Sequence, residues 1–480
     1  MSSKAIPMKK PQHSLPALGI IVMLAGCATT NIDRSLQATN SEAAAFTGGQ
    51  AQLVRSAEMH AANQTKIAEL LKKPLTQTAA VQLALLHSLA LQTLLAERWG
   101  DMAVAAQAGR TANPIFSFER LQFLDGLELN RTLSFGLLDL LTLPQRTAVA
   151  ESRIQQAELR MTSDVVDQVT QVRQAWVKAV AAHENLSYAQ RVYATAEASA
   201  ELARRMQGAG NFTRLQRAHQ QAFYADAASQ LLGSQHAATS SREQLVRLLG
   251  LGSGAQETML KLPGRLPDLP REPLAPALVG GALAAQRLDV RLAQLQLDAA
   301  SQAQGLGLVT SLTDIEVGVQ RDTVFDNAAA GKNTRRGYTV DVRLPIFDWG
   351  DAQRASLNAN TLTAAYRLEE TVAGAGSQLR ETYSAYRTAY DLARHYRDEV
   401  VPLRKLISEE NGLRYNGMII GVFELLADTR DQVGAVMGAI SAQQQFWLAD
   451  AALQATLIGR PIIAQAGAPA GKVLGGGPGH

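Results

Sequence analysis

The chain has 480 residues, enough for two or three ordinary domains, and its formal net charge is only +3. This near-neutral balance gives no support for a nucleic-acid partner. Aromatic residues make up 5% of the chain, which is low for one large compact core, whereas alanine and glutamine are frequent. This composition favours long helices packed side by side.

The first 26 residues have the features of an export signal. Three lysines within the first ten residues precede an apolar run over 15–26, which at about 12 residues is too short to cross a bilayer as a helix. Cys27 is the only cysteine, and the small residues in front of it resemble the lipobox of bacterial lipoproteins. That resemblance implies a firm lipid anchor on Cys27. The alternative is an ordinary signal peptide that happens to contain a cysteine. Ala28 favours the outer membrane, because an aspartate there would indicate retention in the inner membrane.

Residues 27–73 are rich in serine, threonine, alanine and glutamine with weak periodicity, and we interpret them as a lipidated N-terminal tether. A first repeat follows over 74–262. Its elements are indicated by apolar residues at helical spacing, by a helix stop at Asn113-Pro114 and by a change in the hydrophobic period after this stop. In chain order these are a helix over 74–112, strands over 115–123 and 127–141, and a helical hairpin over 145–262 with its turn at 208–211.

A second repeat over 274–460 has the same order of elements. Five prolines between 263 and 276 separate the two repeats, and we assign 263–273 as the linker. The predicted elements of the second repeat are a helix over 274–304, strands over 313–323 and 337–346, and a helical hairpin over 353–458 with its turn between 414 and 422. The Gly/Pro-rich tail over 461–480 is expected to be disordered.

The predicted strands alternate between apolar and polar residues. Ile315, Val317 and Val319 point one way, and the polar residues between them point the other way. Such strands are typical of a transmembrane β-barrel; the alternative is a half-buried hairpin packed on helices. Four strands cannot close a barrel, and an open edge in a membrane is costly. Two copies would give eight strands with a filled interior, and three copies would give twelve strands around a lumen.

This duplicated order of helix, two strands and helical hairpin, with YNGMIIGVFELL near the end of the second copy, resembles the TolC-like outer-membrane efflux family over 74–460. The lipobox resembles the lipoprotein branch of that family. The resemblance implies a homotrimer, with a twelve-stranded β-barrel in the outer membrane and an α-helical barrel that extends into the periplasm. It also implies that a periplasmic adaptor and an inner-membrane pump are partners, that the outer-membrane lipid surrounds the barrel, and that the channel itself catalyses nothing. The substrate and the energy source of the pump are not encoded in this pattern.

In that family the two hairpin turns form a periplasmic tip that is closed at rest. Tyr415 matches the aromatic position before the second turn, and Glu424 an acidic position after it. Simple helix packing is the alternative for Tyr415, and a solvated helix face for Glu424. Ile420 stands where a basic residue is expected in some members, which puts the same salt-bridge network in doubt. The residues one turn further that could replace it are Asp428, Arg430 and Asp431.

The turns are also the candidate contacts for an adaptor, because small residues allow a partner helix to approach closely. The candidates in the first turn are Arg205, Gly208, Gly210, Asn211 and Arg214, and those in the second turn are Gly417 and Gly421.

No catalytic or metal site is predicted. The eight histidines lack metal-ligand spacing, and the glycines over 250–254 follow a helix, which excludes a dinucleotide loop. No cofactor is expected apart from the lipid on Cys27. Two further non-enzyme hypotheses stay open: a periplasmic adaptor, which would need a lipoyl-like β-domain, and a structural coiled-coil lipoprotein without a pore, which would need sustained heptads.

Overall fold

The computed structural model describes residues 31–123, 126–252, 259–275, 286–310, 314–326, 331–344 and 346–461. The predicted signal peptide, the lipidation site at Cys27 and the tail after 461 lie outside these described residues. The chain divides into two units. The first comprises Met1–Ile32, Trp99–Ala157 and Leu295–Ala365, and the second comprises Asp33–Arg98, Glu158–Gln294 and Tyr366–His480.

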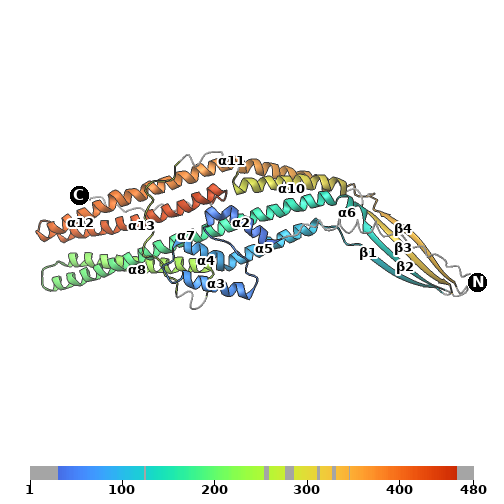
Figure 1. Cartoon of the computed structure of the whole chain (residues 1–480). Helices are drawn as coiled ribbons and strands as arrows, with labels where there is room; N and C mark the ends of the chain where they lie inside the picture. The colour runs from blue at the N-terminus through green and yellow to red at the C-terminus, as the bar shows by residue number, and fades with distance from the viewer. Residues whose placement is uncertain are drawn as a thin grey trace, which may run out of the picture. The chain divides into compact units, whose positions relative to one another are not determined.

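The first unit contains a four-stranded antiparallel sheet in which the hairpins of the two repeats are neighbours. Its strands, in the spatial order β1-β2-β3-β4, are Ile115–Phe123, Gly126–Gly136, Ile315–Asp326 and Gly331–Val342 (Figure 1). The strands β2 and β3 pair between the repeats, from Gly126 with Asp326 to Gly136 with Glu316. All four strands join their helices at the same end of the sheet, because β1 and β3 begin there and β2 and β4 end there.

Three strand predictions were wrong at their ends. The second strand ends at Gly136 and not at 141, because Leu137–Leu141 forms the short helix α6. This leucine-rich run contains no β-branched residue and favours a helix. The third strand ends at Asp326 and not at 323. The fourth strand begins at Gly331 and not at 337, and it ends at Val342 and not at 346. Its first residues are polar, but their pairing with the end of β3 decides their conformation.

Helices make up most of the remaining described chain (Figure 1). They are α2 (Ile32–Thr47), α3 (Ala57–Leu70), α4 (Gln77–His87), α5 (Leu89–Ala108), α7 (Leu143–Gly208), α8 (Arg214–Leu249), α10 (Leu288–Thr310), α11 (Asp351–His395), the π-helix η3 (Tyr396–Val400), α12 (Val401–Asn416) and α13 (Val422–Ile458). The 66 residues of α7 correspond to about 100 Å at 1.5 Å per residue.

The helices differ from the prediction in several places. The helix predicted over 274–304 is observed as α10, Leu288–Thr310, and 274–275 are not helical. The predicted tether contains two helices, and α2 buries Leu36 and Phe46. The predicted helix over 74–112 is broken at Ser88, whose buried hydroxyl accepts a hydrogen bond from the N–H of Leu91 at 3.4 Å and so caps α5. The helix α8 ends at Leu249 and not at 262, because Gly250 follows in the left-handed conformation (φ 78°) that ends helices.

The predicted helix from 353 to 414 is interrupted by a π-helix. A proline inside a helix lacks an N–H and its ring clashes with the carbonyl four residues earlier. Pro402 lies in the first turn of α12, directly after the π-helix over Tyr396–Val400. In this π-helix the N–H of Val401 donates to the carbonyl of Tyr396, five residues earlier, so the helical hydrogen-bond pattern changes directly before the proline.

Aromatic side chains in the second unit hold the proline-rich linker against α11 and α13. The hydroxyl of Tyr390 donates to the carbonyls of Pro270 and Arg271 at 3.1 and 3.0 Å. The indole of Trp447 donates to the carbonyl of Pro267 at 3.1 Å. Phe446 lies fully buried beneath these rings. Because the linker forms no regular ladder, side-chain donors from the helices satisfy its carbonyls.

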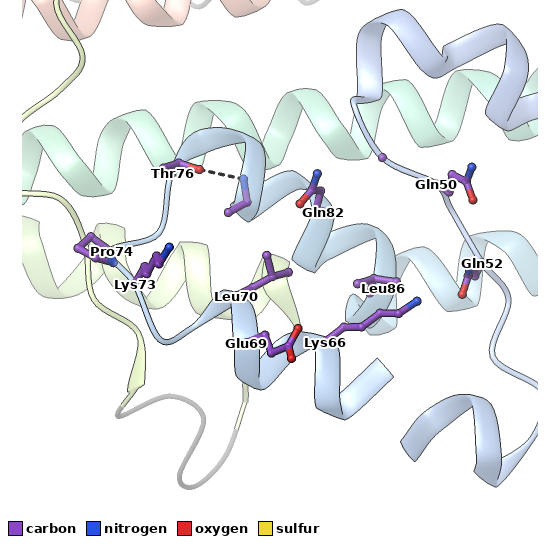
Figure 2. A pocket seen from close by; sticks show the side chains of 12 residues that line it. Gln50, Gln52, Lys66, Glu69, Leu70, Lys73, Pro74, Thr76, Gln82 and Leu86 are labelled. Carbon is purple, nitrogen blue, oxygen red and sulfur yellow. Dashed lines mark hydrogen bonds between the residues drawn. The ribbon is translucent and has the colours of Figure 1, made fainter. Parts of the chain in front are cut away.

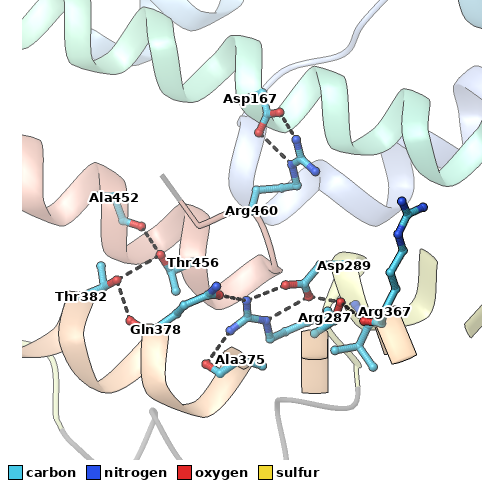
Figure 3. A network of polar contacts seen from close by, with 12 residues as sticks. Asp167, Arg287, Asp289, Arg367, Ala375, Gln378, Thr382, Ala452, Thr456 and Arg460 are labelled. Carbon is cyan, nitrogen blue, oxygen red and sulfur yellow. Dashed lines mark hydrogen bonds and ion pairs between the residues drawn. The ribbon is translucent and has the colours of Figure 1, made fainter. Parts of the chain in front are cut away.

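A buried arginine joins the start of the second repeat to α11 (Figure 3). The side chain of Arg287 is 1% exposed and forms an ion pair with Asp289 at 2.7 Å. It also donates to the carbonyl of Ala375 at 3.0 Å and to the amide oxygen of Gln378 at 3.3 Å. In the same region Arg460 forms an ion pair with Asp167 of α7.

No single helix among the described residues is long and apolar enough to cross a membrane; only the pair of α4 and α5, bent by 51° at its break, passes by length and composition.

Candidate functional site

The first hairpin turn joins α7 to α8 through a tightly hydrogen-bonded loop. The N–H of Asn211 donates to the carbonyl of Met206 at 2.9 Å, and Gly210 has a φ of 82°, which only glycine adopts without strain. Thr213 then starts α8 with a capping box: its hydroxyl accepts from the N–H of Gln216, and the Gln216 side chain accepts from the N–H of Thr213. The sequence TRLQ therefore fixes the point at which the chain re-enters a helix.

Positive charge is exposed beside the first turn. Glu201 forms ion pairs at 2.8 Å with both Arg204 and Arg205, and these contacts lower the pKa of its carboxyl to about 2. One carboxylate thus faces two guanidinium groups. Arg214, on the other side of the turn, is exposed and forms no ion pair with any residue that the structure describes. The predicted contact residues Arg205, Gly208, Gly210, Asn211 and Arg214 all lie at this turn, and Gly208 and Gly210 have open space beside them.

The second hairpin turn has a different chemistry. The N–H of Ile419 donates to the carbonyl of Arg414 at 2.9 Å, and Met418 occupies the left-handed region with a φ of 59°. Met418 and Ile419 are 93% and 70% exposed. Gly417 and Gly421 flank this turn as predicted, but neither has a positive φ: Gly417 caps α12 and Gly421 caps α13. Two exposed apolar side chains therefore form the end of this hairpin.

Ile420, the residue at the position expected to be basic, is buried. It directly precedes the N-cap Gly421, and Leu425 is the fourth helical residue after that cap. These are the two positions of a hydrophobic staple, which fixes the direction in which a chain enters a helix. Ile420 is therefore a buried apolar residue at a staple position, and no charged side chain occupies this position.

The candidate gate residues divide into exposed and buried groups. Tyr415 is 37% exposed, and Glu424 is exposed in the first turn of α13, where a negative charge is favourable. Asp428 is 6% exposed, and neither of its carboxylate oxygens has a hydrogen-bond partner among the described residues. Asp428 therefore forms no salt bridge with the described residues of its own chain that could close a gate.

Two of the three residues that could replace the missing basic residue, Arg430 and Asp431, make contacts with other helices. Asp431 forms an ion pair with Arg404 of α12 at 2.9 Å, which closes the second hairpin above its turn. The guanidinium of Arg430 lies 5.3 Å from the ring of Phe223 on α8. This cation–π contact joins the second hairpin to the first. Arg404 and Phe223 were missed from the sequence. The contact of Arg404 depends on how α12 packs against α13, and that of Phe223 depends on how the second hairpin packs against the first.

The two hairpins pack together above their turns, within the second unit. Val192 and Ala196 of α7 and Phe223 and Ala227 of α8 form a buried cluster, and Val433 of α13 packs against it. Tyr193 and Tyr224 join α7 to α8 through their hydroxyls at 2.9 Å, and this hydrogen bond raises the pKa of Tyr193 to about 12. The turns of both repeats thus end in one helical assembly.

The sheet of the first unit separates charge between its two faces. Directly opposite residues share a face, so the register assigns every strand residue to one of two sets. We call the face with Phe116, Leu133, Val319 and Tyr338 the apolar face, and the opposite one the acidic face. All six strand carboxylates lie on the acidic face: Glu119, Glu128, Glu316, Asp322, Asp326 and Asp341. The apolar face carries large exposed side chains, including Phe116 at 64% and Tyr338 at 82%.

Other hollows in the described structure lack a recognisable chemistry. A pocket of about 640 Å³ lies between the 49–52 segment and helices α3 and α4, with Lys66, Glu69 and Gln82 among its lining residues (Figure 2). The described residues contain no group of three or more His, Cys, Asp or Glu side chains that could hold a metal ion.

No protein-family model matches the sequence, and no curated protein is similar to it in sequence. Solved structures match its fold. A membrane protein from Pseudomonas aeruginosa is 18% identical with a TM-score of 0.67, and the match covers 79% of this chain and 93% of that one. The outer membrane protein VceC from Vibrio cholerae is 16% identical with a TM-score of 0.66, covering 85% of this chain and 100% of that one. The open state of the MtrE outer membrane channel of Neisseria gonorrhoeae is 19% identical with a TM-score of 0.63, covering 80% and 89%.

This chain shares the fold of outer-membrane channels. The predicted fold is thereby confirmed: a mainly helical chain with long helical hairpins and a four-stranded sheet. The predicted turn residues lie at the turns, whereas the separation of charge in the sheet was found only from the register.

Proposed function

We propose that this protein is the outer-membrane exit duct of a tripartite efflux system and passively conducts substrates that a pump delivers. The observation that carries the proposal is the sheet. It is apolar on one face and acidic on the other, and its edge strands β1 and β4 have no partner strand among the described residues. A sheet of this kind is stable in a bilayer only when its edges pair with other copies. Three copies give twelve strands, which enclose an open lumen lined by the acidic faces.

The match to solved channels over nearly their whole length supports this function. It also supports a non-catalytic role. A periplasmic adaptor or a coiled-coil spacer would leave the apolar face of the sheet unexplained. We propose a homotrimer whose helices extend into the periplasm, with a periplasmic adaptor and an inner-membrane pump as partners.

The hairpin turns are the proposed adaptor contact. Arg205 and Arg214 give the first turn an exposed positive charge, and Met418 and Ile419 give the second an exposed apolar end. A complementary adaptor would carry acidic groups opposite the first turn. We expect Arg214→Glu to weaken assembly with the adaptor in a pull-down from membranes, while Lys332→Glu, on the sheet, leaves it unchanged. Assembly unaffected by Arg214→Glu would contradict this contact.

We further propose that Cys27 carries a lipid that anchors the chain in the outer membrane. Its position after Leu24-Ala25-Gly26 supports this. Mass determination of the mature N-terminal peptide tests it, and Cys27→Ser is the matched control. A mature protein that begins elsewhere than at Cys27, or whose N-terminal peptide has no acyl mass, would exclude the anchor.

The decisive experiment for the channel is extraction of the full chain in detergent, followed by mass determination, negative-stain microscopy and conductance in a planar bilayer. We expect a three-chain particle with a hollow stalk and a membrane band, and a steady conductance after insertion. A monomer or a solid rod without conductance would exclude a channel.

A further inference from the structure

Three arginines form a row across the apolar face of the sheet. The register pairs Arg131 of β2 with Arg321 of β3, and Arg321 with Arg336 of β4. Neighbouring strands lie about 4.8 Å apart, so three guanidinium groups are attached within about 10 Å. Like charges directly opposite each other destabilise a sheet. None of the three forms an ion pair with any described residue, and Arg321 and Arg336 are exposed.

The same face contains no acidic group that could balance this charge. Every strand carboxylate lies on the acidic face, whereas five of the six basic strand residues lie on the apolar face. The five are Arg120, Arg131, Arg321, Lys332 and Arg336. Arg335, on the acidic face, is directly opposite Asp322. The cations of the apolar face therefore have no counter-charge among the described strand residues of that face.

The row lies at a boundary of the apolar face. Between the row and the helix-bearing end of the sheet, this face carries only apolar and aromatic side chains, among them Phe116, Val319 and Tyr338. Its basic residues all lie in the row or between the row and the hairpin turns. At the helix end, the exposed rings of Phe347 and Trp349 follow the sheet. An apolar band with aromatic residues at both borders is the pattern of a membrane-spanning sheet.

We propose that Arg131, Arg321 and Arg336 bind the phosphate groups of lipid headgroups in the leaflet nearer the hairpin turns. This inference rests on the proposed function, which places the helices in the periplasm and therefore the hairpin turns on the cell-exterior side. Glycolipids of the outer leaflet carry phosphates, and the planar guanidinium binds phosphate oxygens in a bidentate manner. The ligand is thus a phosphorylated glycolipid, whose acyl chains lie along the apolar band.

The test measures lipid binding by the purified full chain and does not depend on conductance. The probe is lipid A, a phosphorylated glycolipid, titrated into the detergent-solubilised protein and followed by native mass spectrometry. A basic residue at an anionic lipid surface contributes about fivefold in affinity, so Arg131→Gln/Arg321→Gln/Arg336→Gln should lose roughly a hundredfold. Arg335→Gln, next to Arg336 but on the other face, is the matched control and should bind as the wild type does.

Two further measurements identify the ligand. Dephosphorylated lipid A should bind the wild type as weakly as phosphorylated lipid A binds the triple variant. Inorganic phosphate should not raise the melting temperature of the wild type, whereas lipid A should. Equal binding of lipid A by the triple variant, equal binding of the dephosphorylated lipid, or equal stabilisation by free phosphate would each overturn the proposal.

The result is separable from that of the channel experiment. If the triple variant does not fold, Arg336→Gln alone carries the test, with an expected loss of about fivefold. A trimer that conducts but does not distinguish the two forms of lipid A overturns only the lipid site. A chain that forms no trimer overturns the proposed function itself.

Discussion

Arg287 shows how a single residue can connect distant parts of the chain. Its guanidinium is almost fully buried and contacts Asp289, Ala375 and Gln378 (Figure 3). Removing one partner of a buried ion pair leaves the other charge unpaired, which costs about 3–5 kcal/mol. Its contacts with α11 were not predictable from the sequence, because Ala375 lies 88 residues further along the chain.

We therefore expect Arg287→Gln to lower the free energy of unfolding by about 3 kcal/mol, because Asp289 loses its counter-charge. Thermal unfolding followed by circular dichroism measures the change. Arg287→Lys is the control: it keeps the charge but not the planar fork, and it should lose less. If the Gln variant melts at the temperature of the wild type, Arg287 does not stabilise the fold.

Glu184 gives the stability of the second unit a pH dependence. Its carboxylate on α7 accepts a hydrogen bond from the N–H of Leu266 in the linker at 3.3 Å. Burial raises the pKa of Glu184 above its ordinary value of 4.5, and the opposite effects of this hydrogen bond and of Arg265 are smaller. The ionised form is therefore less favourable in the folded protein than in the unfolded chain.

A raised pKa of the folded state stabilises the fold at pH values below the ordinary pKa, and this contribution is lost as the pH rises through the raised value. Glu184→Gln keeps an acceptor for Leu266 and cannot ionise. We expect it to melt above the wild type at neutral pH and together with it in acid, where the wild-type carboxyl is protonated. A constant difference at all pH values would show that titration of Glu184 is not responsible.

At the scale of elements, the sequence was informative wherever one local signal decided the structure. The turn of the first hairpin follows from Gly210 and Thr213, and α7 follows from a long stretch without proline. The errors occurred where contacts between elements decide. The start of β4 depends on its pairing with β3, and the break at Ser88 lies against Gly250, where a Cβ atom would come within 2.7 Å of the His87 carbonyl oxygen.

The site residues show the same limit. The turn positions were predictable, because glycine and capping residues mark them locally. The separation of acidic from basic residues between the two faces of the sheet was not predictable. Alternation along one strand shows which of its own residues share a face, but not which residues of the neighbouring strand lie on that same face. The register settles this, since Glu316 and Asp341 lie directly opposite each other on the acidic face.

In the proposed channel, the acidic face predicts a preference for cations. A unit charge 4 Å from an ion in water changes its energy by about 1 kcal/mol, or about fivefold in local concentration. We expect Glu316→Gln/Asp341→Asn to lower the cation-to-anion permeability ratio by up to about this factor. The reversal potential under a salt gradient in a planar bilayer measures it. The control Lys332→Gln, on the apolar face, should leave the reversal potential unchanged. If Glu316→Gln/Asp341→Asn also leaves it unchanged, the acidic face does not line the ion path.

At the scale of the whole molecule, the duplication bears on the proposed trimer. Each repeat supplies one hairpin, and the pairing of β2 with β3 merges the hairpins into one sheet. The outer edges, β1 and β4, have no partner strand among the described residues. The apolar face supports a bilayer setting, and unpaired backbone groups there cost several kcal/mol each. In the proposed barrel, closure therefore uses other copies of the chain.

The edge of β4 can be blocked without disturbing its own sheet. The N–H of Arg343 donates to the carbonyl of Asp314 at 2.9 Å, which continues the ladder between β3 and β4. Hydrogen-bonded and non-hydrogen-bonded pairs alternate along an antiparallel ladder. Arg343 and Asp341 therefore bond to β3, while the N–H groups of Val342 and Val340 point to the free edge. Proline is tolerated at such an edge position.

We expect Val340→Pro to abolish the trimer, because it removes an edge donor and places a ring where β1 of the next copy would pair. Native mass spectrometry in detergent should then find single chains in place of trimers, with the helix content by circular dichroism unchanged. Val340→Thr keeps the edge donor and a β-branched side chain, and it should remain trimeric. A trimeric Val340→Pro variant would mean that β4 does not lie at the junction between copies, and that the twelve-stranded barrel is closed in another way or not at all.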